Sequence, residues 1–549
     1  MLPVGNFVRL PAAAFGFLLA ATVAAVAQEG INVCLKSGVL VRAVRIESRN
    51  AKFIVYPEGG GNPIELSEDQ VKGIGVPCGS PAPPAATPTT GVQRFGIYGS
   101  NTIGERLMPL LIDTFAQKKY GVRSVVHPIG PEESTIDIRS SGGSDPIAII
   151  EYQAKGSGTS AKALLEKKAV IGMSSRRAND DEAAKVLAQY NLNLRGPGNE
   201  HVLALDGLAV VVHPDNPVKQ LTLDQIARIF SGEIANWKDV SGAGADGRPV
   251  AGLDRPIKVH ARDDKSGTYD TFVALVLSPA DGPKRKISPQ ATRYESSENL
   301  SEAVAKDPGA IGFIGFPYIG KNHPLSIAST CGLTSLPAKF TVKTESYPLA
   351  RRLYLYTVGT QNDTIARDIL QFALSDDAQP TVVDGEFIDQ SIEFQDGAGQ
   401  QQWRQTLVAN PQLGLGADKN VPSNMVRAFD AILQGAGRTA IVFRFEYASS
   451  DLDVRALQDV DRLARYLKSP AVAGKRALIV GFADSNGSWG SNARLAGQRA
   501  ARVAEELQKR GVNVPAKDVL PLSYMAPVAC NDTPGGQAKN RRVEVWIAK

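Results

Sequence analysis

Strand-like and helix-like runs alternate along the chain between about residue 92 and residue 392. This alternation predicts an α/β domain, or a pair of them, in which helices pack on a sheet. Strands are expected at residues 95–98, 208–212, 257–260, 310–314 and 353–357. Helices are expected at residues 103–120, 161–168, 223–230 and 365–374. The expected fold class of the whole chain is therefore multidomain α/β.

Length and composition indicate several ordinary domains. At roughly 150 residues per domain, a chain of 549 residues contains three or four. A composition with 43% hydrophobic and 21% charged residues excludes a wholly disordered chain, a fibrous repeat and a polytopic membrane protein. The net charge of +5 is too small to indicate nucleic acid as a partner. The histidines are widely spaced, which excludes a local zinc motif, and neither a metal nor a cofactor is expected.

Residues 1–27 have the pattern of a signal peptide. Arg9 precedes an apolar run over residues 11–27, which ends in Ala25-Val26-Ala27, the small-x-small motif that signal peptidase needs. The alternative is an uncleaved membrane anchor, but the run is shorter than the roughly 20 residues that span a bilayer. The mature protein is expected to be exported and to begin near Gln28.

The segment after the signal peptide predicts a small β module over residues 28–78. Residues 40–47 alternate in the period-two manner of strands, and residues 53–56 are a second strand candidate. Residues 79–91 are an uncharged, proline-rich linker, a composition that favours an extended conformation. In an oxidising compartment, Cys34 and Cys78 are the best disulfide candidates. Cys331 and Cys530 lie in different segments and are candidates for free thiols.

The last part of the chain alternates again. Residues 393–437 are a glutamine-rich, weakly patterned connector. Over residues 438–549 the expected order is β-α-β-α-β, with strands at 440–445, 477–482 and 543–547 and helices at 454–467 and 492–508. This order predicts a small sandwich with helices on one face of the sheet.

The central region repeats one local pattern three times. Glycine and hydroxyl residues precede a predicted helix at residues 99–102, 156–160 and 265–268. Free N–H groups at the positive end of a helix, with close backbone approach at glycine, can hold a small oxyanion. Arg262 lies four residues before Ser266 and is expected to add a charge-assisted contact, with Asp264 holding Arg262 in place. The alternative is that these residues are simply N-caps. No Walker loop is present.

These stretches resemble the phosphate-binding protein of high-affinity phosphate ABC transporters, a two-lobed type II periplasmic solute-binding fold. The matching stretches are GSNTIGERLMPLL, KGSGTSAKALL, IGMSSRR, GLAVVVHPDNPV, IFSGEIANWKDV, ARDDKSGTYDTF and PGAIGFIGF. In that family the anion is held between two lobes by the same helix starts. The resemblance implies phosphate contacts from Thr102, the Ile103 amide, Ser157, Arg262, Ser266, Gly267 and Thr268.

One position departs from that family. Some members have an aspartate where this chain has Ser175, and that aspartate accepts the proton of hydrogenphosphate. A hydroxyl can donate or accept, so Ser175 is retained as a candidate ligand. The change removes a fixed negative charge that rejects fully ionised anions such as sulfate. Phosphate, or a related oxyanion, stays the expected ligand. Arg176 and Arg177 are assigned neither to the site nor to the solvent.

The C-terminal region contains a second constellation. Asp484 follows a predicted strand and Arg499 lies 15 residues later in the next predicted helix. Such a pair can bind a zwitterion, because the aspartate takes an ammonium and the arginine a carboxylate. The alternative is a plain surface ion pair, which contributes little.

This constellation resembles the OmpA-like peptidoglycan-binding domain. The matching elements are Gly-x-x-Asp at 481–484, Asn-x-x-Leu at 492–495, Arg-Ala at 499–500 and Asn-Arg-Arg-Val-Glu at 540–544. The resemblance implies that Asp484 and Arg499 grip the diaminopimelate residue of the peptide stem. Asn492 belongs to the motif, Arg542 is expected to help shape the site, and Arg541 is expected to be a surface charge of the strand.

The expected function is therefore a non-catalytic binding protein with no catalytic residues. It is expected in the periplasm, near the cell wall and outer membrane, where it captures phosphate by closure of two lobes and is anchored non-covalently to peptidoglycan. Phosphate uptake with an ABC permease is implied by the resemblance alone. The alternatives are a wall-associated phosphate sensor or structural protein, and a phosphatase-like enzyme of the same fold.

Overall fold

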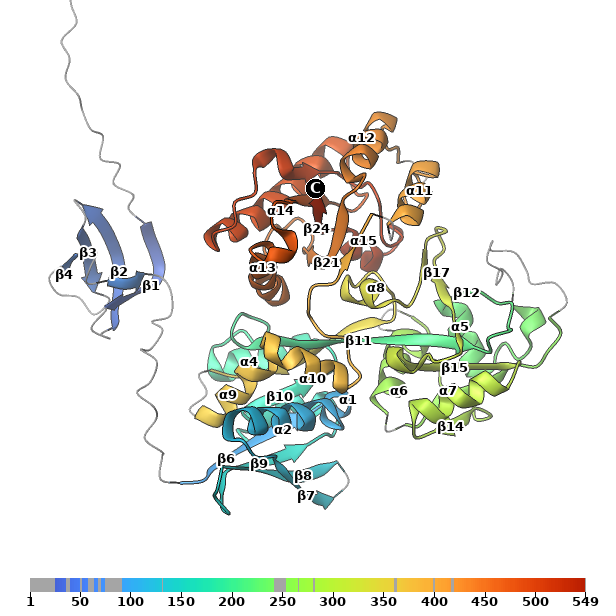
Figure 1. Cartoon of the computed structure of the whole chain (residues 1–549), viewed down its shortest axis with the longest axis horizontal. Helices are drawn as coiled ribbons and strands as arrows, with labels where there is room; N and C mark the ends of the chain where they lie inside the picture. The colour runs from blue at the N-terminus through green and yellow to red at the C-terminus, as the bar shows by residue number, and fades with distance from the viewer. Residues whose placement is uncertain are drawn as a thin grey trace, which may run out of the picture. The chain divides into compact units, whose positions relative to one another are not determined.

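The computed structural model describes residues 25–35, 40–49, 52–57, 64–67, 71–74 and 91–548, except 131, 241–252, 265, 280–281, 360–362, 398–399 and 416–418. Two compact units divide the chain, Met1–Gly91 and Val92–Lys549 (Figure 1). Among the helices of the described residues, none is both long and apolar enough to span a bilayer. The predicted signal peptide falls outside the described residues, apart from residues 25–27 at the start of β1.

The first unit contains an antiparallel sheet with strand order β4-β3-β2-β1-β5. Its strands are β1 (Ala25–Leu35), β2 (Leu40–Arg49), β3 (Lys52–Pro57), β4 (Ile64–Ser67) and β5 (Val71–Ile74). The two strands expected from sequence are β2 and β3, so the β character of this segment is confirmed. The predicted pairing of Cys34 with Cys78 involves a residue outside the described ranges and stays a prediction.

The second unit begins with the region expected to be α/β, and the expected alternation is confirmed. Its first part consists of β6 (Gln93–Gly99), α1 (Asn101–Gly104), α2 (Leu107–Tyr120), β7 (Val125–Gly130), β8 (Glu133–Arg139), β9 (Pro146–Gln153), α3 (Gly158–Leu165), β10 (Ile171–Ser174) and α4 (Asp180–Tyr190). The helix expected over 103–120 is divided into α1 and α2, because Arg106 leaves the helical conformation at φ −136°.

The chain then forms a second lobe and returns to the first. The second lobe consists of β11 (Glu200–Val212), β12 (Gln220–Thr222), α5 (Leu223–Ser231), β13 (Lys258–Arg262), α6 (Gly267–Phe272), a π-helical turn (Val273–Leu277), β14 (Thr292–Tyr294), α7 (Ser297–Lys306), β15 (Ala310–Gly315), β16 (His323–Pro324), β17 (Ser326–Ala328), β18 (Thr334–Ser335) and α8 (Lys339–Lys343). The return consists of β19 (Ala350–Tyr356), α9 (Thr364–Ala373) and α10 (Gln379–Asp384).

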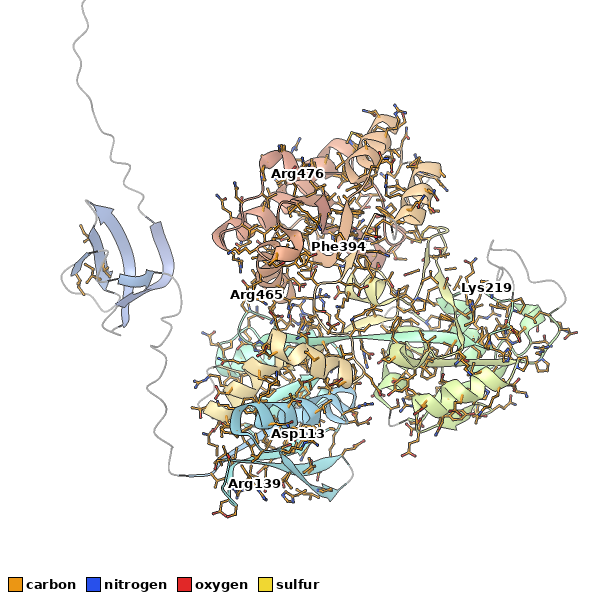
Figure 2. The ribbon with its side chains drawn as sticks, in the orientation of Figure 1. Asp113, Arg139, Lys219, Phe394, Arg465 and Arg476 are labelled. Carbon is orange, nitrogen blue, oxygen red and sulfur yellow. A yellow bond between two sulfur atoms is a disulfide. The ribbon has the colours of Figure 1, made fainter. Side chains whose placement is uncertain are left out.

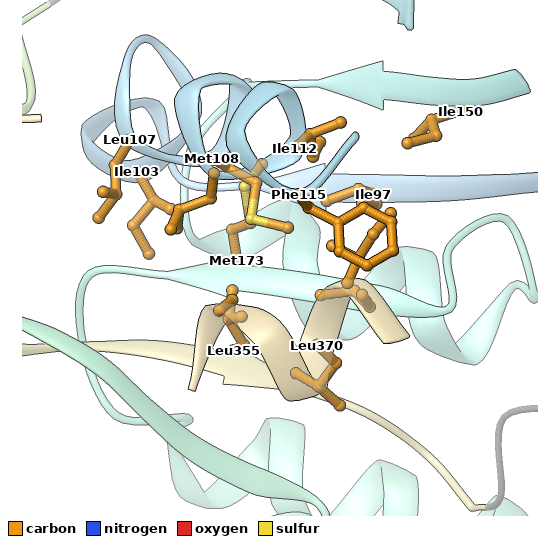
Figure 3. Packing of buried hydrophobic residues seen from close by; sticks show 14 of the residues in the cluster. Ile97, Ile103, Leu107, Met108, Ile112, Phe115, Ile150, Met173, Leu355 and Leu370 are labelled. Carbon is orange, nitrogen blue, oxygen red and sulfur yellow. The ribbon is translucent and has the colours of Figure 1, made fainter. Parts of the chain in front are cut away.

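Two long strands join the lobes. The sheet order β14-β13-β15-β11-β19-β10-β6-β9-β8-β7 places β11 and β19 side by side in the middle. The first half of β11 pairs with β19, and its second half, from Leu208, pairs with β15 of the second lobe; Figure 1 shows β11 running across this region. Each lobe has its own core. In the first core, Ile97, Met108 and Phe115 pack with Leu355 and Leu370 (Figure 3). Separate cores on shared strands suit a hinge between the lobes.

The C-terminal region is a mixed α/β sandwich, as expected from sequence. It consists of β20 (Phe394–Gln395), α11 (Gln401–Ala409), α12 (Ser423–Leu433), β21 (Gly437–Arg444), α13 (Val454–Leu467), β22 (Arg476–Phe482), α14 (Trp489–Lys509), β23 (Val519–Pro521), α15 (Pro534–Asn540) and β24 (Arg542–Ala548). The sheet order is β20-β21-β24-β22-β23. The strand β23 and the helix α15 are additions to the expected order.

The expectation of helices on one face of this sheet needs correction. Helices α13 and α14 pack on the face that carries Ile479 and Val545. Helix α12, from the segment expected to be a weakly patterned connector, packs on the opposite face against Val480 and Trp546. Period-two alternation of apolar side chains along β22 and β24 makes both faces apolar, so the helices of the connector are needed to cover the second one.

A cluster of charges joins the central and C-terminal regions. Glu345, which follows α8 and has only 18% of its side chain exposed, binds Arg352 at 2.5 Å. It also pairs with Arg455 of α13, and Arg444 of β21 lies 3.7 Å away. Burial alone would raise the pKa of Glu345, but Arg352, Arg455 and Arg444 hold that pKa well below its usual range. One carboxylate therefore neutralises guanidinium groups from both regions.

A disulfide adds a covalent link between the same two regions. Cys331 and Cys530 are bonded across 199 positions of sequence. The expectation that these two cysteines are free thiols is therefore wrong. It failed because the residues lie in segments that only the folded chain brings together, and no local spacing reports such a contact.

Replacing Glu345 by glutamine is expected to destabilise the second unit strongly. Removing the carboxylate takes a counter-charge from Arg352 and Arg455 and leaves Arg444 without an ion pair among the described residues, a loss on the order of 3 kcal/mol. Urea unfolding of the Glu345→Gln variant and of the parent measures this difference in the free energy of unfolding. Asp376→Asn is the matched control, because Asp376 also pairs across the regions, with Arg465 (labelled in Figure 2), but both side chains are exposed. Such a pair contributes less than about 1 kcal/mol. Equal losses from the two variants would contradict this role of Glu345.

Candidate functional site

Three loops of the first lobe meet at one edge of its sheet. They follow the parallel strands β6, β9 and β10. The Ser100 amide donates to the Met173 carbonyl at 2.9 Å, and the Gly156 amide donates to the Gly99 carbonyl at 2.8 Å. Loops at the carboxyl ends of parallel strands are the usual place for a ligand in an α/β sheet.

The candidate ligands Ser157 and Ser175 lie together in these loops. Their hydroxyl oxygens are 3.0 Å apart, and the Ser175 amide donates to Ser157 Oγ at 2.9 Å. Ser157 precedes α3 without capping it through its side chain, and Ser100 likewise makes no side-chain cap to α1. The alternative that these serines are simply N-caps therefore does not describe them.

The candidate ligands Thr102 and Gly267 come from different lobes and touch. A Cβ atom on Gly267 would lie 2.6 Å from the Cα of Thr102. No residue other than glycine fits at the start of α6 without moving α1, since atoms do not approach this closely. Thr102 is 8% exposed, and its neighbour Ile103 is fully buried. Two of the three predicted helix starts therefore meet directly.

Arg351 lies where these helix starts meet, and it was not among the site residues predicted from the sequence. Its Nη2 donates to Thr102 Oγ1 and to the Gly267 carbonyl, both at 3.0 Å, and its Nε donates to Asp206 at 3.1 Å. Asp206 and Arg351 are paired residues of β11 and β19, the strands that join the lobes. One sequence pattern could have identified it. Side chains alternate along β19, and Arg351 falls on the same face of the strand as the buried Leu353 and Leu355.

At this junction, the pKa values of Arg351 and Asp270 are shifted by burial and by neighbouring charges. Burial lowers the pKa of Arg351, while the neighbouring carboxylates of Asp206 and Asp270 act to raise it. Loss of solvent raises the pKa of Asp270, and Arg351 opposes that rise. A cavity of about 420 Å³ is lined by Ser157, Ser175, Asp270 and Arg351, among others. The cavity lining therefore combines hydroxyl groups, the carboxylate of Asp270 and several guanidinium groups, of which Arg351 is the one at the junction.

The remaining second-lobe candidates lie at the ends of β13 and β14. Arg262 donates to Ser297 Oγ at 2.6 Å and to the Glu295 carbonyl at 2.7 Å. Asp264 does not hold Arg262 as expected; it pairs with Arg293 at 2.9 Å. Ser266 is a true N-cap, since its hydroxyl accepts from the Thr268 amide at 3.2 Å. The N-cap alternative therefore applies to Ser266.

The adjacent arginines of the first lobe have carboxylate partners. Arg176 binds Glu182 at 2.7 Å and Arg177 binds Glu200 at 2.9 Å. Both side chains line the cavity described above. Arg176 and Arg177 therefore do not lie where Thr102 and Gly267 meet, and they are not simply solvent-facing either. They contribute positive charge at the edge of the cavity.

The candidate pair Asp484 and Arg499 lies inside the C-terminal region. Asp484 is 4% exposed and Arg499 is 0% exposed, so the alternative of a surface ion pair is wrong. Arg499 donates to the carbonyls of Ser449 at 3.0 Å and Glu446 at 3.1 Å. Its Nη1 is buried and has no hydrogen-bond partner among the described residues. Burial lowers the pKa of Arg499 to about 10, with help from Arg541.

The two arginines at the start of β24 have roles opposite to those expected. Arg541, expected at the surface, is buried and pairs with Asp484 at 3.1 Å. Arg542, expected to shape the site, is fully buried, pairs with Glu544 at 2.7 Å and lies over the Phe482 ring. The error arises because Arg541 directly precedes the first residue of β24, so strand alternation does not fix the direction of its side chain.

Asn492 holds the loop that carries Asp484. Its side-chain amide donates to the Asn486 carbonyl at 2.7 Å, and the Asn486 amide donates to Asp484 Oδ1 at 2.9 Å. Asn492 therefore positions the carboxylate. In the described part of the chain no group of three metal-ligating side chains is close enough to hold a metal ion.

Comparison with known proteins identifies both regions. A family model for a PBP superfamily domain matches residues 85–377, and a model for the OmpA family matches residues 444–541. The phosphate-binding protein PstS of Bacillus subtilis (strain 168) is 32% identical over 239 residues, which cover 44% of this chain and 70% of that protein. The PstS of Staphylococcus haemolyticus is 28% identical over 238 residues, which cover 42% of this chain and 69% of that protein.

Solved structures are also similar. The crystal structure of an ABC-type phosphate transport receptor from Vibrio cholerae is 23% identical, with a TM-score of 0.39, and the match covers 54% of this chain and 99% of that one. The two PstS relatives are named as phosphate-binding proteins, in agreement with the expectation of a non-catalytic protein. The chain belongs to the PBP superfamily, with a PstS-like domain at residues 85–377 and a C-terminal OmpA domain at residues 444–541.

Proposed function

We propose that this protein captures phosphate between its two lobes as the first step of phosphate uptake with an ABC permease, while its OmpA domain holds it to peptidoglycan. The observation that supports phosphate capture is the meeting of Thr102 and Gly267 at Arg351, beside the Ser157–Ser175 pair. These groups come from both lobes and donate hydrogen bonds from hydroxyls, amides and one guanidinium. Such donors hold an oxyanion well when they are shielded from water.

Lobe closure is the proposed mechanism. Thr102 lies in the first lobe and Gly267 in the second, so an anion that accepts hydrogen bonds from both helix starts is best bound when the lobes are closed. Arg351 and Asp206 lie on the joining strands and link the two sides. Arg351 is therefore proposed as a positioning residue that holds Thr102 and Gly267 in register for the anion.

Asp270 is proposed to supply the selectivity that Ser175 lacks. Its carboxylate lines the same cavity as Ser157 and Ser175. A carboxylate accepts a hydrogen bond from protonated phosphate and repels a fully ionised anion such as sulfate. The negative charge that rejects sulfate would thus come from Asp270 in α6. It would not come from residue 175, which follows β10 and is an aspartate in some members of the family.

Adding a methyl group at Gly267 is expected to weaken phosphate binding at least about tenfold, or about 1.4 kcal/mol. The new Cβ would press on Thr102 and move α1 away from α6. Calorimetry on phosphate-stripped protein compares Gly267→Ala with the parent. Gly490→Ala is the control, since Gly490 also lies in the first turn of a helix, α14, has no heavy atom within 4 Å of the added Cβ, and does not line the anion cavity. Absence of phosphate binding by the parent protein would refute the proposal.

Removing the Asp270 charge is expected to reduce the preference for phosphate over sulfate about tenfold, because the repulsion of the unprotonated anion is lost. Competition calorimetry with phosphate and sulfate on Asp270→Asn and on the parent measures this change in preference. Since the pKa of Asp270 is raised, the preference of the parent should also fall as the pH is lowered towards that pKa. Asp264→Asn is the control, because Asp264 pairs with Arg293. An unchanged preference in Asp270→Asn would assign selectivity elsewhere.

The unpartnered Nη1 of Arg499 supports the wall-binding proposal. A buried guanidinium nitrogen without a partner is costly, and a ligand carboxylate would satisfy it. Asp484 beside it would take the ammonium of the same residue, as the OmpA resemblance implies for diaminopimelate.

Neutralising Asp484 is therefore expected to weaken sedimentation with purified sacculi at least about tenfold, because the ligand ammonium loses its counter-charge. The variant is Asp484→Asn, and unchanged phosphate binding would show that it is folded. Asp461→Asn is the control, since Asp461 is an exposed partner of Arg510 on the same domain. Equal sedimentation of Asp484→Asn and parent would exclude this residue from wall binding.

A further inference from the structure

The proposed wall-binding site lies next to a cavity that the two domains share. This cavity, of about 690 Å³, is lined by Glu446, Ser449 and Arg541 of the OmpA domain. Its other side is formed by Arg177, Arg352 and Tyr354 of the PstS-like domain. The Glu345 cluster and the Cys331–Cys530 disulfide fix these two sides against each other.

The OmpA-domain residues that line the cavity contact Asp484 and Arg499, the pair proposed to bind diaminopimelate. Arg499 donates to the carbonyls of Glu446 and Ser449, and Arg541 pairs with Asp484. Asp484 and Arg499 are not among the lining residues, but their direct partners are, so a ligand that extends past this pair on that side would enter the shared space.

The PstS-like side of the cavity offers positive charge. Arg352 is already engaged by Glu345 and Asp453. Arg177 is different, because 43% of its side chain is exposed and it binds Glu200 through Nε and Nη2. On the OmpA side Lys539 lines the same space, and its ammonium makes no ion pair within the described ranges. The lining also includes the carboxylates of Glu446 and Asp451, so an additional carboxylate of a ligand would be placed against Arg177 and Lys539.

We propose that the peptide stem of peptidoglycan spans this cavity, so that the PstS-like domain supplies the second half of the wall-binding site. The inference rests on the proposed wall binding. Diaminopimelate has two amines and two carboxylates. One amine and one carboxylate occupy Asp484 and Arg499, the second amine is in the amide bond of the stem, and the second carboxylate lies against Arg177. The solute-binding domain thereby takes part in recognising the wall.

The test is calorimetric titration of the full chain with a soluble tripeptide stem that ends in diaminopimelate. Arg177→Gln, which keeps an amide donor for Glu200, is expected to bind about fivefold more weakly. Arg176→Gln is the matched control, because Arg176 lines the anion cleft and is absent from the lining of the shared cavity. Amidation of the second carboxylate should weaken binding to the parent and abolish the difference between Arg177→Gln and the parent.

The outcomes separate this inference from the wall-binding proposal. If the parent does not bind the peptide, the proposed wall function fails. If Asp484→Asn abolishes binding but Arg177→Gln binds as tightly as the parent, the wall function stands and the shared site is overturned. Equal binding of the free and amidated peptides by the parent would overturn it as well, and this measurement does not depend on the folding of any variant.

Discussion

The contact between Glu345 and the arginines of two domains links the PstS-like domain to the OmpA domain within the second unit. A carboxylate that is mostly withdrawn from water is costly unless it is neutralised. Arg352 of the PstS-like domain and Arg455 of the OmpA domain neutralise it together, so separating the domains would remove part of the charge that compensates the buried Glu345 carboxylate. Together with the disulfide, this contact holds the residues proposed to bind the wall and those proposed to bind the anion in one compact unit.

The same principle operates within the PstS-like domain. Arg351 is surrounded by Asp206, Thr102 and the Gly267 carbonyl, so one buried cation connects the joining strands with the helix starts of both lobes. Because β11 and β19 pair with each other and then separate into different lobes, a small change in their pairing would alter the distance between Thr102 and Gly267. The cleft and its hinge are therefore built from a single network of hydrogen bonds.

Periodicity and local motifs in the sequence predicted most of this structure. The alternation of apolar residues predicted both α/β regions. Hydroxyl and glycine residues before helices singled out Ser157, Thr102 and Gly267, and the family resemblance added Ser175. The structure brings Ser157 next to Ser175 and Thr102 against Gly267. The roles of Arg351 and Arg541 and the Cys331–Cys530 bond were missed. These contacts join residues 249, 57 and 199 positions apart, and no local pattern reports them. The amphipathic helix α12 was missed because polar, glutamine-rich neighbours obscured its apolar stripe.

The central claim is that one folded chain binds phosphate and the cell wall at the same time. It is tested most directly by adding radiolabelled phosphate to purified sacculi that carry the phosphate-stripped full chain and measuring the label that sediments. The account predicts that labelled phosphate sediments in proportion to bound protein and is displaced by unlabelled phosphate. Label that stays in the supernatant while the protein sediments would contradict the account.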